Sequence, residues 1–150
     1  SLPNWRLTKF GREHIMALQI RRSALEQVLN HAKQDHPIEA CGLIAAQEGS
    51  LVAERVLPMQ NRAASEVFYQ FDSREQFQVY RRLDEDDQEC CVIYHSHTAS
   101  QAFPSKDDID FAGHPELHYL IVSTWDQATV PVRSFRIIDG GVTEETIVIV

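Results

Sequence analysis

Apolar residues recur along this chain either at the spacing of one helix face or in short strand-like runs. These two patterns predict where the helices and strands lie. Leu18-Gln19-Ile20 starts the organised part as a strand, and Ser23-Ala24-Leu25-Glu26 has the composition of a helix capping box. Apolar residues then recur at the spacing of one helix face, at Leu25, Val28, Leu29 and Ala32. We expect this helix to end near Asp35, because Pro37 disfavours helical backbone in the residue before it.

The remaining pattern predicts short strands around two further helices. One helix begins at Asp72 or Ser73 and places Phe77, Tyr80 and Leu83 on one face. A short helix runs from Ser105 to Ala112 and stops at Gly113. The expected strands are 41–47, 51–57, 67–71, 90–94, 117–123, 132–138 and 142–150, with turns at 48–50 and 139–141 and a polar loop at 59–65. The pattern predicts one α+β domain with a mixed sheet and two main helices.

Residues 1–15 show no clean period, and Met16 stands immediately before the first organised strand. We interpret 1–15 as an expression-derived extension or a flexible N-terminal arm, and 16–150 as the domain. A length of 150 residues is enough for one domain with a buried core.

Charge and hydropathy exclude two classes of partner. The formal net charge is −8, which argues against binding to nucleic-acid phosphates. No apolar run approaches the roughly 20 residues of a membrane span. The acidic run 84–87 ends the second predicted helix, and we interpret it as a solvated surface rather than a docking site.

The chain has three cysteines, Cys41, Cys90 and Cys91. An odd number with two adjacent residues is a poor disulfide framework and suits the reducing cytoplasm. We expect Cys90 and Cys91 to lie in a strand with at least one of them buried. Cys41 is either a core thiol or part of a pocket wall, and the core is favoured.

Two histidines two residues apart, His95 and His97, give the strongest chemical signal. Side chains at i and i+2 of a strand point to the same face, about 7 Å apart along the chain, so both imidazoles can reach one ion while Ser96 points away. Asp108, in the first turn of the short predicted helix, can supply a carboxylate if the loop 98–104 folds back. Two imidazoles and a carboxylate form a zinc site with one position open for water, which is typical of catalytic zinc.

Each of these residues also has a purely structural interpretation. Ser105 and Asp108 fit a helix N-cap with an acid in the first turn, and this role is compatible with metal binding. Glu39 by itself could be only a surface acid after Pro37. The other histidines are taken as ordinary core or surface residues, namely His14, His31, His36, His114 and His118.

Taken together, Glu39, His95-Ser96-His97, Ser105 and Asp108 resemble the signature of the JAMM (MPN+) metalloproteases. The similarity extends from about Leu18 to the C-terminus and is strongest to the bacterial branch that includes the cysteine peptidase of a ubiquitin-like sulfur-carrier protein. Many family members have proline after the second histidine, whereas this chain has Thr98, as in the sulfur-carrier branch. The resemblance implies a single MPN/JAB-like domain, in which a mixed, curved β-sheet is flanked by two main helices and a short helix follows the metal-binding loop.

The resemblance also implies a role for each residue. His95, His97 and Asp108 would bind one Zn²⁺, and Glu39 would act as the proton shuttle. Ser105 would donate a hydrogen bond to the oxyanion rather than act as a nucleophile, because no partner base is evident for it.

The implied reaction is hydrolysis of a peptide or isopeptide bond after the Gly-Gly tail of a small ubiquitin-like sulfur carrier. It would release cysteine or a short C-terminal peptide in cysteine or siderophore biosynthesis. The chain is too short for the insertions of relatives specific for ubiquitin chains, and an exposed strand edge would permit a homodimer.

Two other classes of protein fit the sequence less well. A non-catalytic MPN-type binding module would be expected to lack some of the ligands, yet all five signature positions are occupied here. A zinc deaminase would need a Pro-Cys-x-x-Cys motif, which the adjacent Cys90 and Cys91 cannot supply.

Overall fold

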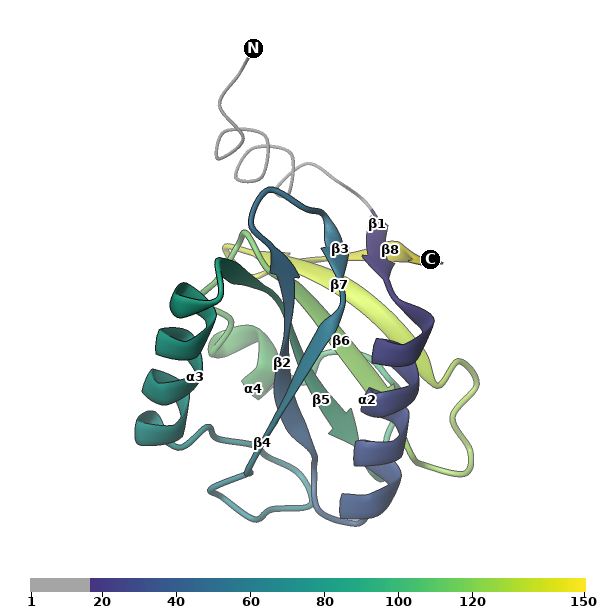
Figure 1. Cartoon of the computed structure of the whole chain (residues 1–150). Coiled ribbons are helices and arrows are strands. Elements are labelled where there is room, and N and C mark those ends of the chain that lie inside the picture. The colour runs from purple at the N-terminus through teal and green to yellow at the C-terminus, as the bar shows by residue number, and fades with distance from the viewer. Residues whose placement is uncertain (1–16) are drawn as a thin grey trace.

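The computed structural model describes residues 17–150, which fold into one mixed eight-stranded sheet with three helices (Figure 1). The strand order across the sheet is β3-β1-β8-β7-β6-β5-β2-β4. The helices are α2 (Arg22–Asp35), α3 (Ser73–Glu85) and α4 (Lys106–Asp110). The strands are β1 (Ala17–Ile20), β2 (Cys41–Gln47), β3 (Val52–Ala53), β4 (Arg55–Met59), β5 (Gln88–His97), β6 (His118–Ser123), β7 (Val132–Ile138) and β8 (Gly141–Ile149).

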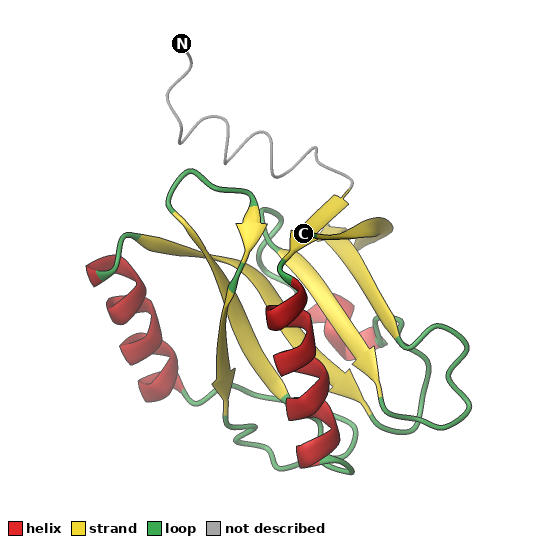
Figure 2. Cartoon of the chain, turned by 45° about the vertical axis from the view of Figure 1, so that its right-hand side comes forward, coloured by secondary structure: helices red, strands yellow, loops and turns green. Residues whose placement is uncertain are grey.

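The two faces of the sheet carry separate apolar clusters. Helix α2 buries Ala24, Val28 and Ala32 against one face, which includes Val92 and Leu120. On the opposite face, α3 and α4 pack against a second cluster that includes Leu43, Ile93, Ile121 and Phe135. Figure 2 shows α2 in front of the strands and α4 behind them. The central strand β5 pairs antiparallel with β2 and parallel with β6, so side chains on both of its faces are buried.

Several predicted elements are confirmed. The strands at 41–47 and 132–138 have the expected bounds, and the histidine pair lies within β5. Asp72 caps α3, because its side chain accepts a hydrogen bond from the Glu75 N–H. The acidic run 84–87 is exposed, as expected of a solvated surface. The predicted hairpin turns contain Gly49 and Gly140 at φ of 82° and 79°, the left-handed backbone that glycine adopts without steric cost.

Other predicted elements are wrong in their bounds or type. Helix α2 begins one residue earlier than its expected capping box, and Arg21, at the N-cap, makes no side-chain capping bond. Ser23 is therefore inside the first turn. The expected strand 51–57 is split at Glu54, because β3 pairs with β1 whereas β4 pairs with β2. Helix α4 ends at Asp110, short of the predicted stop at Gly113.

The expected strand at 67–71 is a loop that forms only a single bridge, between Asn61 and Phe71. Its backbone groups bond instead to the side chain of Asn61, which replaces a strand ladder. On α3, the inward residues are Val79 and Leu83, whereas Phe77 is 67% exposed. The predicted helix is therefore confirmed, but the face that it buries is only partly the predicted one, because Leu83 points inward and Phe77 does not.

The cysteines lie as predicted from their number and spacing. Cys41 and Cys91 are buried and Cys90 is half-buried, and no disulfide joins any of the three, all of which lie in the described part of the chain. Among residues 17–150, no helix has the length and apolar character needed to span a membrane. The boundary expected at Met16 and the nature of 1–15 lie outside the described residues.

A tight contact in the centre of the sheet gives a first testable prediction. Gly42 in β2 lies opposite Tyr94 in β5, and a Cβ atom on Gly42 would lie 2.4–2.5 Å from the Tyr94 ring and hydroxyl. The ring cannot move away easily, because its hydroxyl bonds to His31 Nδ1 of α2 at 2.7 Å. We expect Gly42→Ala to lower the free energy of unfolding by about 1–3 kcal/mol, measured by chemical denaturation.

The matched control is Gly113→Ala, since a Cβ atom there would meet nothing within 4 Å. Equal stability of the two variants would contradict close packing at Gly42.

Candidate metal centre

The histidine pair occupies the C-terminal end of β5, on the face of the sheet that α3 and α4 cover. His95 lies opposite Cys41 of β2 and Ile121 of β6, which fixes the side of the sheet that its ring faces. Because successive strand residues alternate, His97 shares this face and Ser96 points to the other. Both rings are buried, with exposures of 2% and 5%. The backbone arrangement predicted from the His-x-His spacing is therefore present.

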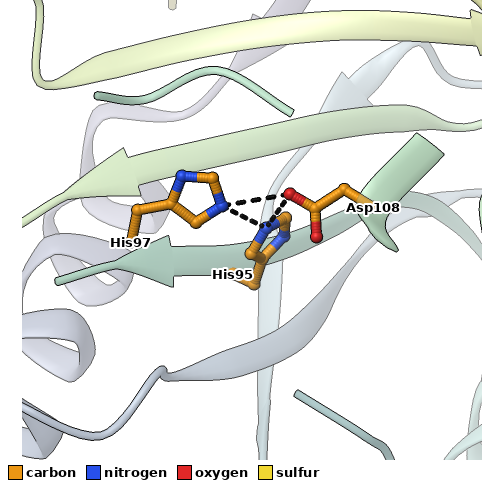
Figure 3. A group of neighbouring side chains, drawn as sticks. All are labelled: His95, His97 and Asp108. Atoms are coloured by element: carbon orange, nitrogen blue, oxygen red, sulfur yellow. Dashed lines mark hydrogen bonds and ion pairs between the residues drawn. The ribbon is translucent and has the colours of Figure 1, made fainter. Parts of the chain in front are cut away.

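Asp108 completes the group from α4 (Figure 3). Its Oδ2 atom lies 3.1 Å from His95 Nε2 and 3.0 Å from His97 Nε2, and the two Nε2 atoms are 3.2 Å apart. Asp108 is held by a capping box in which its N–H donates to Ser105 Oγ and the Ser105 N–H donates to Asp108 Oδ2. The helix cap thus orients the same carboxylate that faces the histidines.

The two imidazoles are oriented in different ways. The Nδ1–H of His97 donates to the Gln101 carbonyl at 2.8 Å, which leaves the Nε2 lone pair of the neutral ring directed at the group. The ring of His95 stacks on Tyr69, with centroids 4.5 Å apart and an interplanar angle of 25°. Its buried Nδ1 has no hydrogen-bond partner among the described residues.

The distances fit a single divalent ion. Two ligands about 2.05 Å from a tetrahedral zinc ion lie about 3.3 Å from each other. The three ligand atoms here are 3.0–3.2 Å apart, close to that separation. Two imidazole lone pairs and a carboxylate oxygen would repel one another without a cation between them. Of the described residues, only His95, His97 and Asp108 form a group of this kind.

Burial and hydrogen bonding shift the pKa values of these groups in different directions. Burial lowers the pKa of His95 below its ordinary value. Burial also acts to lower the pKa of His97, but hydrogen bonds to Asp108 and the Gln101 carbonyl outweigh it and raise that pKa. The pKa of Asp108 is held far below its usual range, because its bonds to the two histidines outweigh the effect of burial. The carboxylate is therefore ionised, as a metal ligand must be.

Glu39 lies immediately before β2, next to the group but outside it. The residue is only 4% exposed, and burial raises the pKa of its carboxyl group to about 8, with His97 opposing and Asp108 reinforcing the shift. A bound cation nearby would favour the ionised form of this carboxyl group. An acid whose pKa lies near neutrality is suited to accept and return a proton.

The backbone around Glu39 is tied to the histidine strand by residues that sequence reasoning missed. The Ala40 N–H donates to Ser96 Oγ at 2.7 Å, and the Ser96 N–H donates to the Ala40 carbonyl. The Asn61 side chain donates to the Glu39 carbonyl at 3.1 Å. Neither role has a local sequence signal, because each contact joins segments at least 22 residues apart.

Ser105 lies at the exposed N-cap of α4, one helical turn from Asp108. Its Oγ accepts the Asp108 N–H at 3.1 Å, so the hydroxyl proton remains available for another acceptor. The structural interpretation of Ser105 as a helix cap is therefore correct, and it leaves room for the second role.

A cleft of about 350 Å³ opens beside Asp108. Five aromatic residues contribute to its wall, and Gln70, Gln76 and His114 contribute polar groups. Two of the lining residues, Phe68 and Phe111, pack edge to face with ring centroids 6.1 Å apart. The aromatic lining residues are Phe68, Tyr69, Phe71, Phe111 and Tyr119.

The comparison with known proteins agrees with this geometry. Residues 21–138 match the family described as prokaryotic homologs of the JAB domain. The CysO-cysteine peptidase of Mycobacterium tuberculosis is 46% identical over 136 residues, covering 91% of this chain and 93% of that protein. A desampylase of Haloferax volcanii is 30% identical over 111 residues, covering 71% and 80% respectively.

Solved structures show the same fold. A Desulfitobacterium hafniense protein superposes with a TM-score of 0.77 at 34% identity, covering 90% of this chain and 93% of that one. A JAB1/MPN domain protein from Archaeoglobus fulgidus superposes with a TM-score of 0.57 at 18% identity, covering 87% and 98%. The expected MPN/JAB-like α+β fold is confirmed. The chain belongs to the prokaryotic JAB-domain (JAMM/MPN) family and is a homologue of JAMM-type peptidases with a His-His-Asp group.

Proposed function

We propose that this protein is a zinc-dependent peptidase that cleaves after the Gly-Gly tail of a small ubiquitin-like sulfur-carrier protein and releases cysteine or a short peptide. The observation that carries the proposal is the convergence of three ligand atoms within 4.8 Å of one another, with the buried acid Glu39 beside them. The 46% identity to the CysO-cysteine peptidase supports the choice of substrate.

In this proposal, His95, His97 and Asp108 hold the ion. Two nitrogen ligands and one oxygen ligand, with no fourth protein ligand among the described residues, suit an open catalytic zinc site better than a closed structural one. Zinc in such a site lowers the pKa of coordinated water from about 15.7 to about 7. The Gln101 carbonyl fixes the His97 tautomer, and Tyr69 fixes the plane of His95.

Glu39 and Ser105 would carry out the proton transfer and the charge stabilisation. Glu39 accepts a proton from the attacking water and passes it to the departing amine. The hydroxyl of Ser105 donates to the oxygen of the scissile carbonyl as negative charge develops there, because the bond from the Asp108 N–H uses only a lone pair of Oγ and leaves the hydroxyl proton available. One such donor can lower the barrier by about 2.7–4 kcal/mol.

The position of the cleft supports a peptide tail as substrate. Asp108 lines the cleft together with the aromatic residues Phe68 and Phe111, so an extended chain lying in it would reach the metal group. Glycines allow the substrate backbone to approach closely, because they have no Cβ atom.

The substrate assignment is tested by incubating the zinc-loaded protein with a sulfur carrier that ends in Gly-Gly-Cys. We expect the intact mass of the carrier to fall by one cysteine residue, and a matched carrier ending in Ala-Ala-Cys to be cut at least about tenfold more slowly. Cleavage of neither carrier, with zinc bound, would contradict the proposed substrate.

Glu39→Gln is expected to keep the metal and lose hydrolysis by about 10²–10⁴-fold, because the amide cannot accept the proton. Zinc content by plasma emission spectroscopy and carrier turnover by intact mass are measured on the same sample. Full turnover in this variant would remove Glu39 from the mechanism.

Asp108→Ala is expected to lower the zinc affinity sharply, because it removes the only anionic ligand of the group. The matched control is Asp107→Ala, an exposed acid in the same helical turn. Dialysis against a zinc buffer followed by metal analysis compares the two. Stoichiometric zinc in Asp108→Ala after dialysis would rule out Asp108 as a ligand.

A further inference from the structure

We propose that Asn61 is a positioning residue of this site, whose side-chain amide sets the place of Glu39 and of the aromatic segment 68–70 relative to the metal group. Asn61 touches neither the ligands nor the cleft, and the inference rests on the proposed function. In this inference, the single buried amide of Asn61 couples the position of the proton shuttle Glu39 to the position of the cleft wall.

All four hydrogen-bonding positions of the Asn61 amide are used. Nδ2 donates to the Glu39 carbonyl at 3.1 Å and to the Phe68 carbonyl at 2.9 Å. Oδ1 accepts the Ala63 N–H at 3.0 Å and the Gln70 N–H at 3.1 Å. Both partners of Nδ2 are carbonyls and both partners of Oδ1 are N–H groups, so the orientation of the amide is determined by the network.

The contact with Glu39 restrains the backbone of the proton shuttle from one direction. The Glu39 N–H donates to the Ser65 carbonyl at 3.0 Å, so the loop that follows Asn61 holds both backbone polar groups of Glu39. The next residue, Ala40, is bonded to Ser96 on the histidine strand. The position of Glu39 therefore depends on this loop on one side and on the histidine strand on the other.

The contacts with Phe68 and Gln70 restrain Tyr69 from both sides. Asn61 binds the backbone immediately before and immediately after this residue. The Tyr69 ring stacks on His95, and both Phe68 and Tyr69 line the cleft. A shift of the Asn61 amide would thus move the shuttle and the cleft wall together.

Burial raises the energetic cost of disturbing this amide. Asn61 is 7% exposed, so a lost hydrogen bond cannot be replaced freely by water. A second side chain also binds this loop. The hydroxyl of Thr98, the residue that follows β5, donates to the Glu66 carbonyl at 3.1 Å. That tie binds neither Glu39 nor segment 68–70 directly and ends one residue after Ser65, whose carbonyl accepts the Glu39 N–H, so it provides a comparison for loosening of the same loop without loss of the Asn61 contacts.

Asn61→Asp tests the inference with an isosteric change. A carboxylate can still accept from Ala63 and Gln70, but it cannot donate to the Glu39 and Phe68 carbonyls. We expect kcat to fall about 10- to 100-fold, since a misplacement of about 1 Å can cost 100-fold in rate. Zinc content should stay stoichiometric, because none of the ligands is touched.

Two control variants separate positioning from general damage. Thr98→Val loosens the same loop at Glu66, and its loss of kcat should be several-fold smaller than that of Asn61→Asp. Arg62→Ala changes an exposed neighbour in the loop and should leave kcat and KM unchanged. Equal losses of kcat in Asn61→Asp and Thr98→Val would reduce Asn61 to one loop contact among others.

A double-mutant cycle with Glu39→Gln gives a readout that a merely structural role would not move. If Asn61 acts on the chemical step through Glu39, adding Asn61→Asp to Glu39→Gln should change the residual kcat by less than about twofold, whereas its effect through the cleft wall at 68–70 should appear in KM. A multiplicative loss in the double mutant would overturn the inference. If Asn61→Asp does not fold, as judged by circular dichroism, the uncharged Asn61→Ser is put through the same cycle.

The proposed function and the positioning role fail in different ways. If the wild-type protein cuts no carrier, the proposed function fails, and the cycle is then run on hydrolysis of a generic zinc-peptidase peptide. If the wild-type protein cuts the carrier and Asn61→Asp cuts it equally fast, only the role of Asn61 is wrong.

Discussion

The site depends on the meeting of two imidazole nitrogens and one carboxylate oxygen at 3.0–3.2 Å. These three atoms come from two elements, β5 and α4, whose positions are set by different interactions. The histidines are fixed by the central strand β5, whose neighbours on both sides prevent it from shifting register. The carboxylate is fixed by the capping box of α4. A cation between the two imidazole nitrogens and the carboxylate oxygen would replace their mutual repulsion by attraction. The geometry is therefore suited to a bound metal ion.

Around this group, each supporting contact restricts one degree of freedom. Gln101 selects the tautomer of His97, Tyr69 sets the plane of His95, and Ser105 orients Asp108. Glu39 is buried, which raises the pKa of its carboxyl group to about 8. The carboxyl group can therefore gain and lose a proton near neutral pH. In the proposed mechanism, metal binding and proton transfer are carried by separate residues, and the loop around Asn61 contacts the backbone of Glu39.

Much of the fold was predictable because its signals are local. The short apolar run 41–47 and the strand composition of 132–138 gave the strand bounds directly, and Asp72 or Ser73 marked the start of α3. The predictions failed where tertiary contacts compete with local preference. Segment 67–71 has the composition of a strand, but the buried amide of Asn61 takes its backbone hydrogen bonds. Phe77 has the spacing of a core residue, yet the sheet covers a different side of α3 and leaves this ring 67% exposed.

The sequence by itself determined the identity and spacing of the chemical groups, His95, His97, Ser105, Asp108 and Glu39. It could do so because the i, i+2 spacing of a strand and the cap of a helix are short-range geometric rules. Only the tertiary structure decided that α4 folds back to place Asp108 against the histidines, and that Asn61 and Ser96 hold the backbone around Glu39. These contacts join segments at least 11 residues apart, and their partners are chosen by packing of the two apolar clusters, which no local pattern encodes.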